Sequence, residues 1–193
     1  MLNCIYTRKL RHNCEKSNLK FQVTVKKNLV LLGMMGVGKT TIGEIVAKKQ
    51  DMEFIDTDRN IEKKCFMSVS EIFNKKGEQF FRIEEEKEVL ETIKKNNCVI
   101  SLGGGAFINK AVRDAVLKNT ISVWLDLDLK ILNERIKWNK KRPLLDKENS
   151  SKIIKKLFTE RKDVYELADY KINCDRLTKN DIINKIISIY EKQ

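Results

Sequence analysis

From residue 28 onward, short apolar runs alternate with longer stretches in which hydrophobic and polar positions follow a helical period. Runs with the length and apolar content of buried strands lie at 28–33, 53–58, 98–103, 121–127 and 170–175. Helices are predicted at 39–50, 60–75, 80–95, 110–118, 129–138, 150–168 and 179–191. Strands separated by helices of this length are typical of a parallel sheet with helices on both faces. The pattern therefore predicts an α/β fold.

The periodic pattern covers residues 28–193 without a break that would mark a second domain. There is one proline and no Ser/Gly-rich linker. With 41% hydrophobic and 34% charged residues, the composition is that of one soluble, folded domain. No apolar run approaches the roughly 20 residues that span a bilayer, so no membrane partner is expected. Residues 1–27 lack the pattern, and we expect them to form a disordered basic extension.

The net charge of +12 indicates that the protein binds anionic ligands. Half of it lies in residues 1–27, which hold seven Lys or Arg and one acid. Nucleic acid is the alternative partner, but no recognition motif is present and aromatic residues make up only 7%. The five cysteines are scattered and form no CxxC pair, so neither a disulfide framework nor a zinc site is expected. A reducing compartment, the cytoplasm, fits this cysteine usage.

Residues 33–40, GMMGVGKT, match the phosphate-binding pattern GxxxxGK[ST] and lie between a predicted strand and a predicted helix. Glycines let backbone N–H groups curl around phosphate oxygens, and the helix directs its positive end at the anion. Lys39 is expected to reach the β- and γ-phosphates, and the Thr40 hydroxyl to bind Mg²⁺. No guanine-recognition motif is present, so the nucleotide is expected to be ATP. The expected contacts also include Gly36, Val37, Gly38 and Thr41.

The predicted strand at 53–58 ends in two acids, Asp56 and Asp58. Residues two apart on a strand share a face, so both carboxylates would point to the carboxyl end of the sheet, beside the phosphate loop. One could hold Mg²⁺ through water while the other accepts the proton of a hydroxyl group. The alternative is that both acids cap the helix that follows.

Six segments resemble the shikimate kinase family in order and spacing: GMMGVGKTTIG, DTDRNIE, IFNKKGEQFFRIEE, SLGGGAF, KRPLL and ERKDVYELAD. The resemblance covers residues 28–193, and the last four segments carry most of its specificity. It implies a three-layer P-loop fold with a five-stranded parallel sheet and a lid at about 133–149. It also implies ATP-dependent phosphorylation of the 3-hydroxyl of shikimate, in aromatic amino-acid biosynthesis. Apart from the resemblance, we expect the chain to act as a monomer.

The resemblance also implies roles for individual residues. It implies that Asp56 helps to bind the metal ion through water, and that Asp58 is the catalytic residue that holds and deprotonates the substrate hydroxyl. Two arginines, Arg82 and Arg161, would bind the substrate carboxylate, and the backbone N–H of Gly104 would face the substrate. Arg142, in the lid, would contact the transferred phosphate, and Arg135 would pack on the adenine ring.

Three of these arginines also have a plainer interpretation. Arg82 could form a helix-surface ion pair with Glu85 or Glu86, Arg161 could be an exposed cation, and Arg142 could belong to a solvated basic run. The lid sequence WNKK has no glycine where the family often has one. At the level of function, the alternatives are a gluconate or nucleoside monophosphate kinase of the same fold, a nucleotide-dependent scaffold without catalysis, and a nucleic-acid-binding protein.

Overall fold

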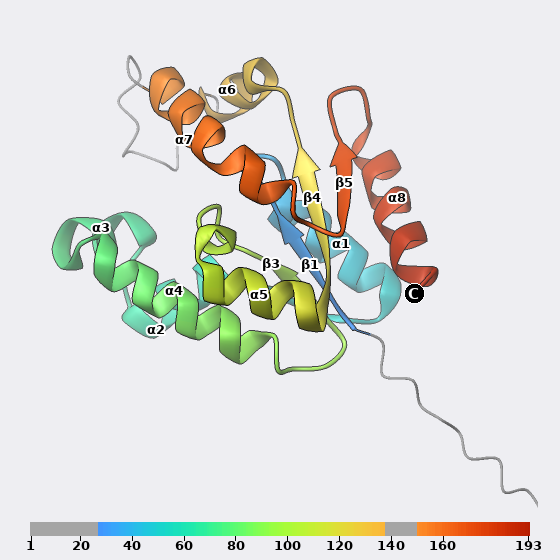
Figure 1. Cartoon of the computed structure of the whole chain (residues 1–193), viewed down its shortest axis with the longest axis horizontal. Coiled ribbons are helices and arrows are strands. Elements are labelled where there is room, and N and C mark those ends of the chain that lie inside the picture. Colours follow the sequence, from blue (N-terminus) through green and yellow to red (C-terminus); the bar gives the residue numbers. More distant parts are fainter. Residues whose placement is uncertain (1–26, 138–149) are drawn as a thin grey trace, which may run out of the picture.

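A computed structural model describes residues 27–137 and 150–193 of the chain. Its centre is one sheet of five parallel strands in the order β2-β3-β1-β4-β5 (Figure 1). The strands are β1 Asn28–Leu32, β2 Glu53–Asp56, β3 Cys98–Ser101, β4 Thr120–Asp126 and β5 Tyr170–Asn173. Because the chain order reverses on either side of β1, the carboxyl end of β1 faces the crevice where such sheets bind ligands.

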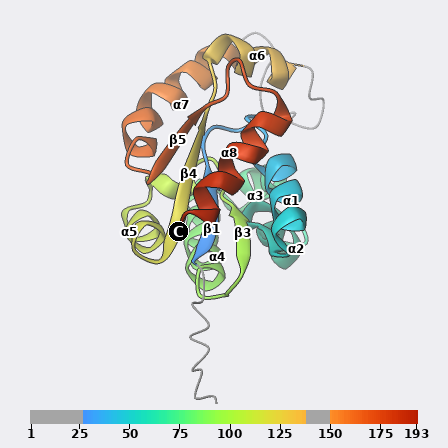
Figure 2. The ribbon, with the colours of Figure 1, turned by 90° about the vertical axis from the view of Figure 1, so that its right-hand side faces the viewer.

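Helices cover both faces of the sheet, which confirms the predicted three-layer α/β architecture. In Figure 2, α1 and α8 lie on one side of the sheet, and α5 and α7 lie on the other. Every residue of β1 is buried, as a central strand between two helical layers requires. The helices are α1 Lys39–Gln50, α2 Thr57–Cys65, α3 Val69–Lys76, α4 Glu78–Thr92, α5 Lys110–Asn119, α6 Leu129–Lys137, α7 Ser150–Tyr165 and α8 Lys179–Glu191, with a short helix η1 at Ala106–Ile108.

The prediction for residues 53–75 was wrong in two places. β2 ends at Asp56, whose side chain accepts a hydrogen bond from Arg59 N at 3.2 Å and so caps α2. Asp58 therefore lies in the first turn of a helix and does not share a strand face with Asp56. The single helix predicted at 60–75 is two helices, because Phe66 adopts φ 52° at the end of α2 and Ser68 caps α3.

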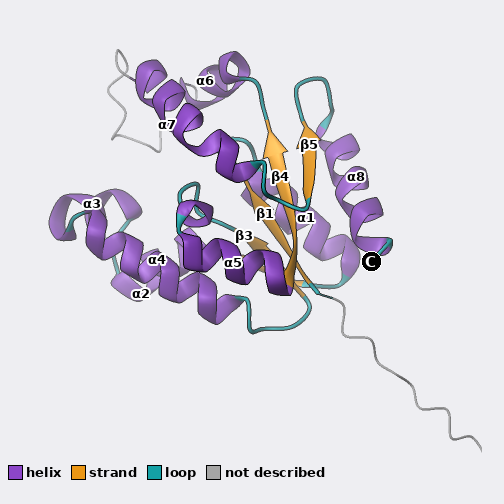
Figure 3. Cartoon of the chain, in the orientation of Figure 1, coloured by secondary structure: helices purple, strands orange, loops and turns teal. Residues whose placement is uncertain are grey.

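Helices α2, α3 and α4 form a group to one side of the sheet (Figure 3). They share a small hydrophobic cluster of Ile61, Ile72 and Phe81, which is separate from the main core around the sheet. The ring of Phe73 packs 4.9 Å from that of Phe81. This second cluster gives the helical group its own internal packing.

In the part of the chain that the structure describes, no helix is long and apolar enough to cross a membrane. The predicted basic extension, apart from Lys27, lies outside the described residues, as does most of the predicted lid.

Candidate active site

The loop between β1 and α1, residues 33–40, is the phosphate loop, and its shape depends on glycine. Gly36 has φ 81°, and a Cβ there would approach Ile136 Cγ1 to 2.9 Å. Lys39 opens α1 and is buried, and its ammonium group donates to Gly33 O at 2.8 Å and Met34 O at 3.0 Å. The loop therefore holds a positive charge at its centre, next to the N-terminus of a helix, which is the arrangement that binds phosphate.

Thr40 and Asp56 meet at the edge of the phosphate loop. Thr40 Oγ1 donates to Asp56 Oδ2 at 2.7 Å, which joins α1 to the end of β2. Among the described residues there is no group of three or more His, Cys, Asp or Glu that could hold a metal ion. Magnesium needs no such group, because it is usually bound by one or two protein oxygens together with phosphate oxygens and water. A hydroxyl and a carboxylate at this distance fit that chemistry.

A second loop, the glycine loop of residues 103–105, follows β3 and lies against the phosphate loop. A Cβ on Gly104 would lie 3.5 Å from Met35 N and 3.8 Å from Gly33 O. Thr57 fixes the glycine loop to the start of α2. It accepts a hydrogen bond from Gly103 N at 3.1 Å and donates one to Ser101 O at 3.2 Å.

Two carboxylates flank Gly103. Asp58 Oδ1 and Glu85 Oε1 each lie 2.5 Å from the point that a Cβ on Gly103 would occupy, so the two oxygens are at most twice that distance apart. Burial raises the pKa of Glu85, while the charges of Arg82 and Arg161 oppose that rise. From the sequence, Glu85 is expected only as a surface partner of Arg82, and Thr57 has no expected role. The three-residue spacing between Arg82 and Glu85 was the one available signal.

Both arginines predicted to bind an acid reach the glycine loop from different helices. Arg82, on α4, is paired with Glu85 at 2.7 Å and with Glu78 at 3.0 Å. The plainer interpretation of Arg82, an ion pair with Glu85, is therefore present. The Arg82 guanidinium also lies against Gly105, where an added Cβ would be 2.9 Å from Arg82 Cζ. Arg161, on α7, donates from Nη1 to Gly104 O at 3.0 Å. Both cations thus point at one short stretch of backbone.

Of the two remaining predicted site residues, the structure describes Arg135 but not Arg142. Arg135, on α6, is exposed and donates to Val37 O at 3.3 Å, which brings its guanidinium beside the phosphate loop. Arg142, the predicted lid arginine, lies outside the described residues.

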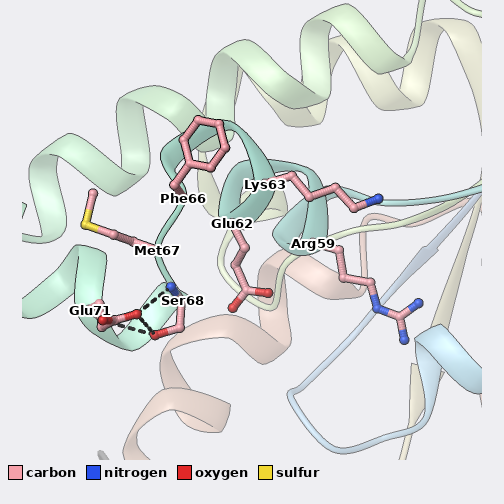
Figure 4. Close-up of a pocket in the computed structure, with 7 residues that line it drawn as sticks. All are labelled: Arg59, Glu62, Lys63, Phe66, Met67, Ser68 and Glu71. Carbon is pink, nitrogen blue, oxygen red and sulfur yellow. Dashed lines mark hydrogen bonds between the residues drawn. The ribbon is translucent and has the colours of Figure 1, made fainter.

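An open groove lies beside the turn between α2 and α3, and none of its lining residues belongs to the phosphate loop or the glycine loop (Figure 4). Among the residues drawn there, the hydrogen bonds are those with which Ser68 and Glu71 cap α3. Phe66 is 93% exposed on its rim. The groove contains none of the predicted site residues, so the phosphate loop and the glycine loop remain the candidate active site.

Comparison with known proteins finds relatives that match most of the chain in sequence and in structure. A family model described as shikimate kinase matches residues 35–191. A shikimate kinase of a Sulfurihydrogenibium species is 42% identical over 162 residues, covering 84% of this chain and 96% of the relative. The structure of a shikimate kinase from Acinetobacter baumannii in complex with shikimate superimposes with a TM-score of 0.81 at 32% identity, covering 86% of this chain and 94% of that chain. A gluconokinase from Sinorhizobium meliloti superimposes with a TM-score of 0.56 at 14% identity, covering 87% of this chain and 95% of that chain, which is a likeness of fold alone.

Proposed function

The chain belongs to the shikimate kinase family, and from that membership we propose how its own residues carry out the reaction. It phosphorylates shikimate at the expense of ATP, a step of aromatic amino-acid biosynthesis. We assign the accepting group as the 3-hydroxyl. The observation that carries the assignment of residues is the meeting of two arginines and a carboxylate around the glycine loop, directly beside the phosphate loop.

The phosphate loop binds the triphosphate of ATP in this proposal. Lys39 turns its ammonium group from the loop carbonyls to the β- and γ-phosphate oxygens, and the backbone N–H groups of Gly36 to Gly38 line the same cradle. Thr40 and Asp56 would hold Mg²⁺, which neutralises charge on the phosphate oxygens as it develops. Thr41 and Arg135 complete the nucleotide contacts, and Arg142 is assigned to the transferred phosphate from the resemblance alone.

The glycine loop binds the acceptor. A carboxylate is best held by planar guanidinium groups, because their N–H donors match its two oxygens and stay charged at any physiological pH. Arg82 and Arg161 supply two such groups from two different helices, and Gly104 supplies a backbone N–H. Asp58 lies beside Gly103, where it orients the accepting hydroxyl and takes up its proton.

Phosphoryl transfer requires little covalent chemistry from the protein, so positioning and charge neutralisation account for most of the rate. The two loops meet these needs separately. One loop holds the donor and the other holds the acceptor, and Gly104 lies against Gly33 and Met35 so that the two are adjacent. We also propose that the enzyme acts as a monomer and that it works in the cytoplasm. The free Cys65, Cys98 and Cys174 of the described residues accord with a reducing compartment.

A coupled assay of ADP release tests the assignment. Shikimate, gluconate and CMP are offered side by side to the full chain, with ATP and with or without Mg²⁺. We expect turnover with shikimate at least about a hundredfold above that with gluconate or CMP, because only shikimate offers both a ring-fixed carboxylate and a matching hydroxyl. Chelation of Mg²⁺ should abolish turnover. Equal or better turnover with gluconate or CMP would refute the acceptor assignment, and undiminished turnover without Mg²⁺ would refute the metal assignment.

A further inference from the structure

Tyr165 is a buried residue at the end of α7 that the function described so far does not use. It is 1% exposed, and its ring packs 5.8 Å from that of Trp124 on β4. Its hydroxyl donates a hydrogen bond to Gly104 O and lies 3.9 Å from Met34 Sδ in the phosphate loop. One buried hydroxyl group therefore touches both loops of the candidate active site.

The carbonyl that Tyr165 contacts is also the one that Arg161 contacts. Arg161 lies one helical turn earlier on α7, so the two side chains project from the same face of the helix. A carbonyl oxygen has two lone pairs and accepts both donors. Gly104 O is thus held from α7 by a phenol and a guanidinium together.

This shared carbonyl links the phenol to acid recognition. A peptide unit is planar, so fixing Gly104 O fixes the plane of the peptide between Gly104 and Gly105. Glycine has no side chain that would otherwise restrict its backbone. The carbonyl in turn gives Arg161 Nη1 a fixed acceptor, which leaves the rest of its fork in one orientation.

We propose that Tyr165 is a positioning residue for the acid substrate, acting through the Gly104 carbonyl on Arg161 and on the glycine loop. The proposal rests on the function proposed above, since it presumes that Arg161 binds the substrate carboxylate. Tyr165 does not touch the substrate. It restricts the loop and the guanidinium before the substrate arrives, so less conformational freedom is lost on binding.

The test is Tyr165→Phe, which keeps the ring against Trp124 and removes only the hydroxyl. We expect the KM for shikimate to rise roughly tenfold, the loss that accompanies removal of one oriented hydrogen bond. The KM for ATP and kcat should each stay within about twofold, because the phosphate loop loses only the 3.9 Å contact to Met34 Sδ and keeps the hydrogen bonds that Lys39 donates to its carbonyls. Tyr170→Phe is the matched control, since it removes an exposed hydroxyl on β5 that accepts a hydrogen bond from Gln193 Nε2 at 2.9 Å.

A double-mutant cycle separates this role from a purely structural one. Arg161→Lys removes the fork on which Tyr165 is proposed to act, so adding Tyr165→Phe to it should raise the KM for shikimate by less than about threefold. Trp124→Phe loosens the packing of the Tyr165 ring and should lower the melting temperature without a selective effect on the KM for shikimate.

The proposal is overturned if Tyr165→Phe leaves the KM for shikimate unchanged. It is equally overturned if the KM values for both substrates rise together, or if the tenfold effect persists in the Arg161→Lys background. The unmodified enzyme measured in the same assay keeps this outcome distinct from failure of the proposed function. If the parent enzyme does not phosphorylate shikimate, the acceptor assignment is what fails, together with the inference that rests on it.

Discussion

Gly103→Ala tests whether the two carboxylates beside the glycine loop must stay where they are. The added methyl group would lie 2.5 Å from Asp58 Oδ1 and 2.5 Å from Glu85 Oε1. Ordinary van der Waals contact begins near 3.4 Å, so each oxygen would have to retreat by about 0.9 Å. Both are the ends of side chains, so they can move, and the backbone of Gly103 is not in the left-handed region.

The expected loss is therefore one of rate more than of stability. A displacement of about 1 Å in a reacting group lowers turnover by roughly a hundredfold. Asp58 is the proposed partner of the accepting hydroxyl, so its retreat should lower kcat by about that factor. The free energy of unfolding should change by less than about 2 kcal/mol, because the Gly103 N–H keeps its bond to Thr57 and the clash falls on the ends of side chains and not on backbone.

The assay is steady-state kinetics of ADP release with shikimate and ATP, together with urea unfolding of the same preparations. Gly43→Ala is the control for packing, since its methyl group would lie 2.5 Å from Cε2 of Phe54, a partly buried ring that packs against the core, and it meets neither carboxylate. We expect Gly43→Ala to lower stability and to leave kcat of the folded enzyme unchanged. A Gly103→Ala enzyme with kcat within about threefold of the parent would refute the reasoning, because the carboxylates could then step aside without loss.

Three further changes probe the same site and its support. Asp58→Asn should lower kcat by roughly two to four orders of magnitude with little change in ATP affinity, as measured by turnover and nucleotide titration; a collapse of ATP affinity would mean that the roles of Asp56 and Asp58 are exchanged. Arg82→Lys should raise the KM for shikimate far more than that for ATP, because lysine lacks the planar fork, and unchanged kinetics would make Arg82 a surface cation only. Phe66→Gly should stabilise the fold by about 1 kcal/mol in urea unfolding, since Phe66 holds φ 52° with its ring exposed; a loss of stability would show that the ring packs on something.

The strands and most helices followed from the sequence because their signals are local. Residues 29–32 form an uninterrupted apolar run within the fully buried β1, and α1 begins and ends at the predicted residues. The phosphate loop was equally accessible, since its glycines, Lys39 and Thr40 occupy fixed spacings between a strand and a helix.

The predicted ends of strand β2 and of helix α2 were wrong because Asp56 and Phe66 each adopt a conformation that the local sequence pattern does not indicate. Asp56 and Asp58 alternate as strand residues do, but the side chain of Asp56 caps the helix and ends the strand before Asp58. The turn at Phe66 was missed because a bulky residue rarely adopts the left-handed conformation. Neither position carries the glycine or proline that marks a break in a sequence.

The contacts that complete the site join residues far apart in the chain, and for that reason no local pattern reveals them. Tyr165 reaches Gly104 across 61 positions, and Thr57 reaches Gly103 across 46. The resemblance to a family supplied Arg82 and Arg161, whereas Tyr165 and Thr57 emerged only when the strands and helices were assembled.

The separate hydrophobic cluster of Ile61, Ile72 and Phe81 has a consequence for how the molecule opens. Regions with their own packing form units that open without unfolding the rest of the domain. The cluster joins α2 and α3 to the start of α4, whereas Val89 farther along α4 belongs to the main core, so the helical group is anchored to the sheet at that end. Arg82 lies on the part of α4 next to the small cluster, and Arg161 lies on α7. We expect a bound acid that contacts both guanidinium groups to join the helical group to α7 and so to oppose local opening.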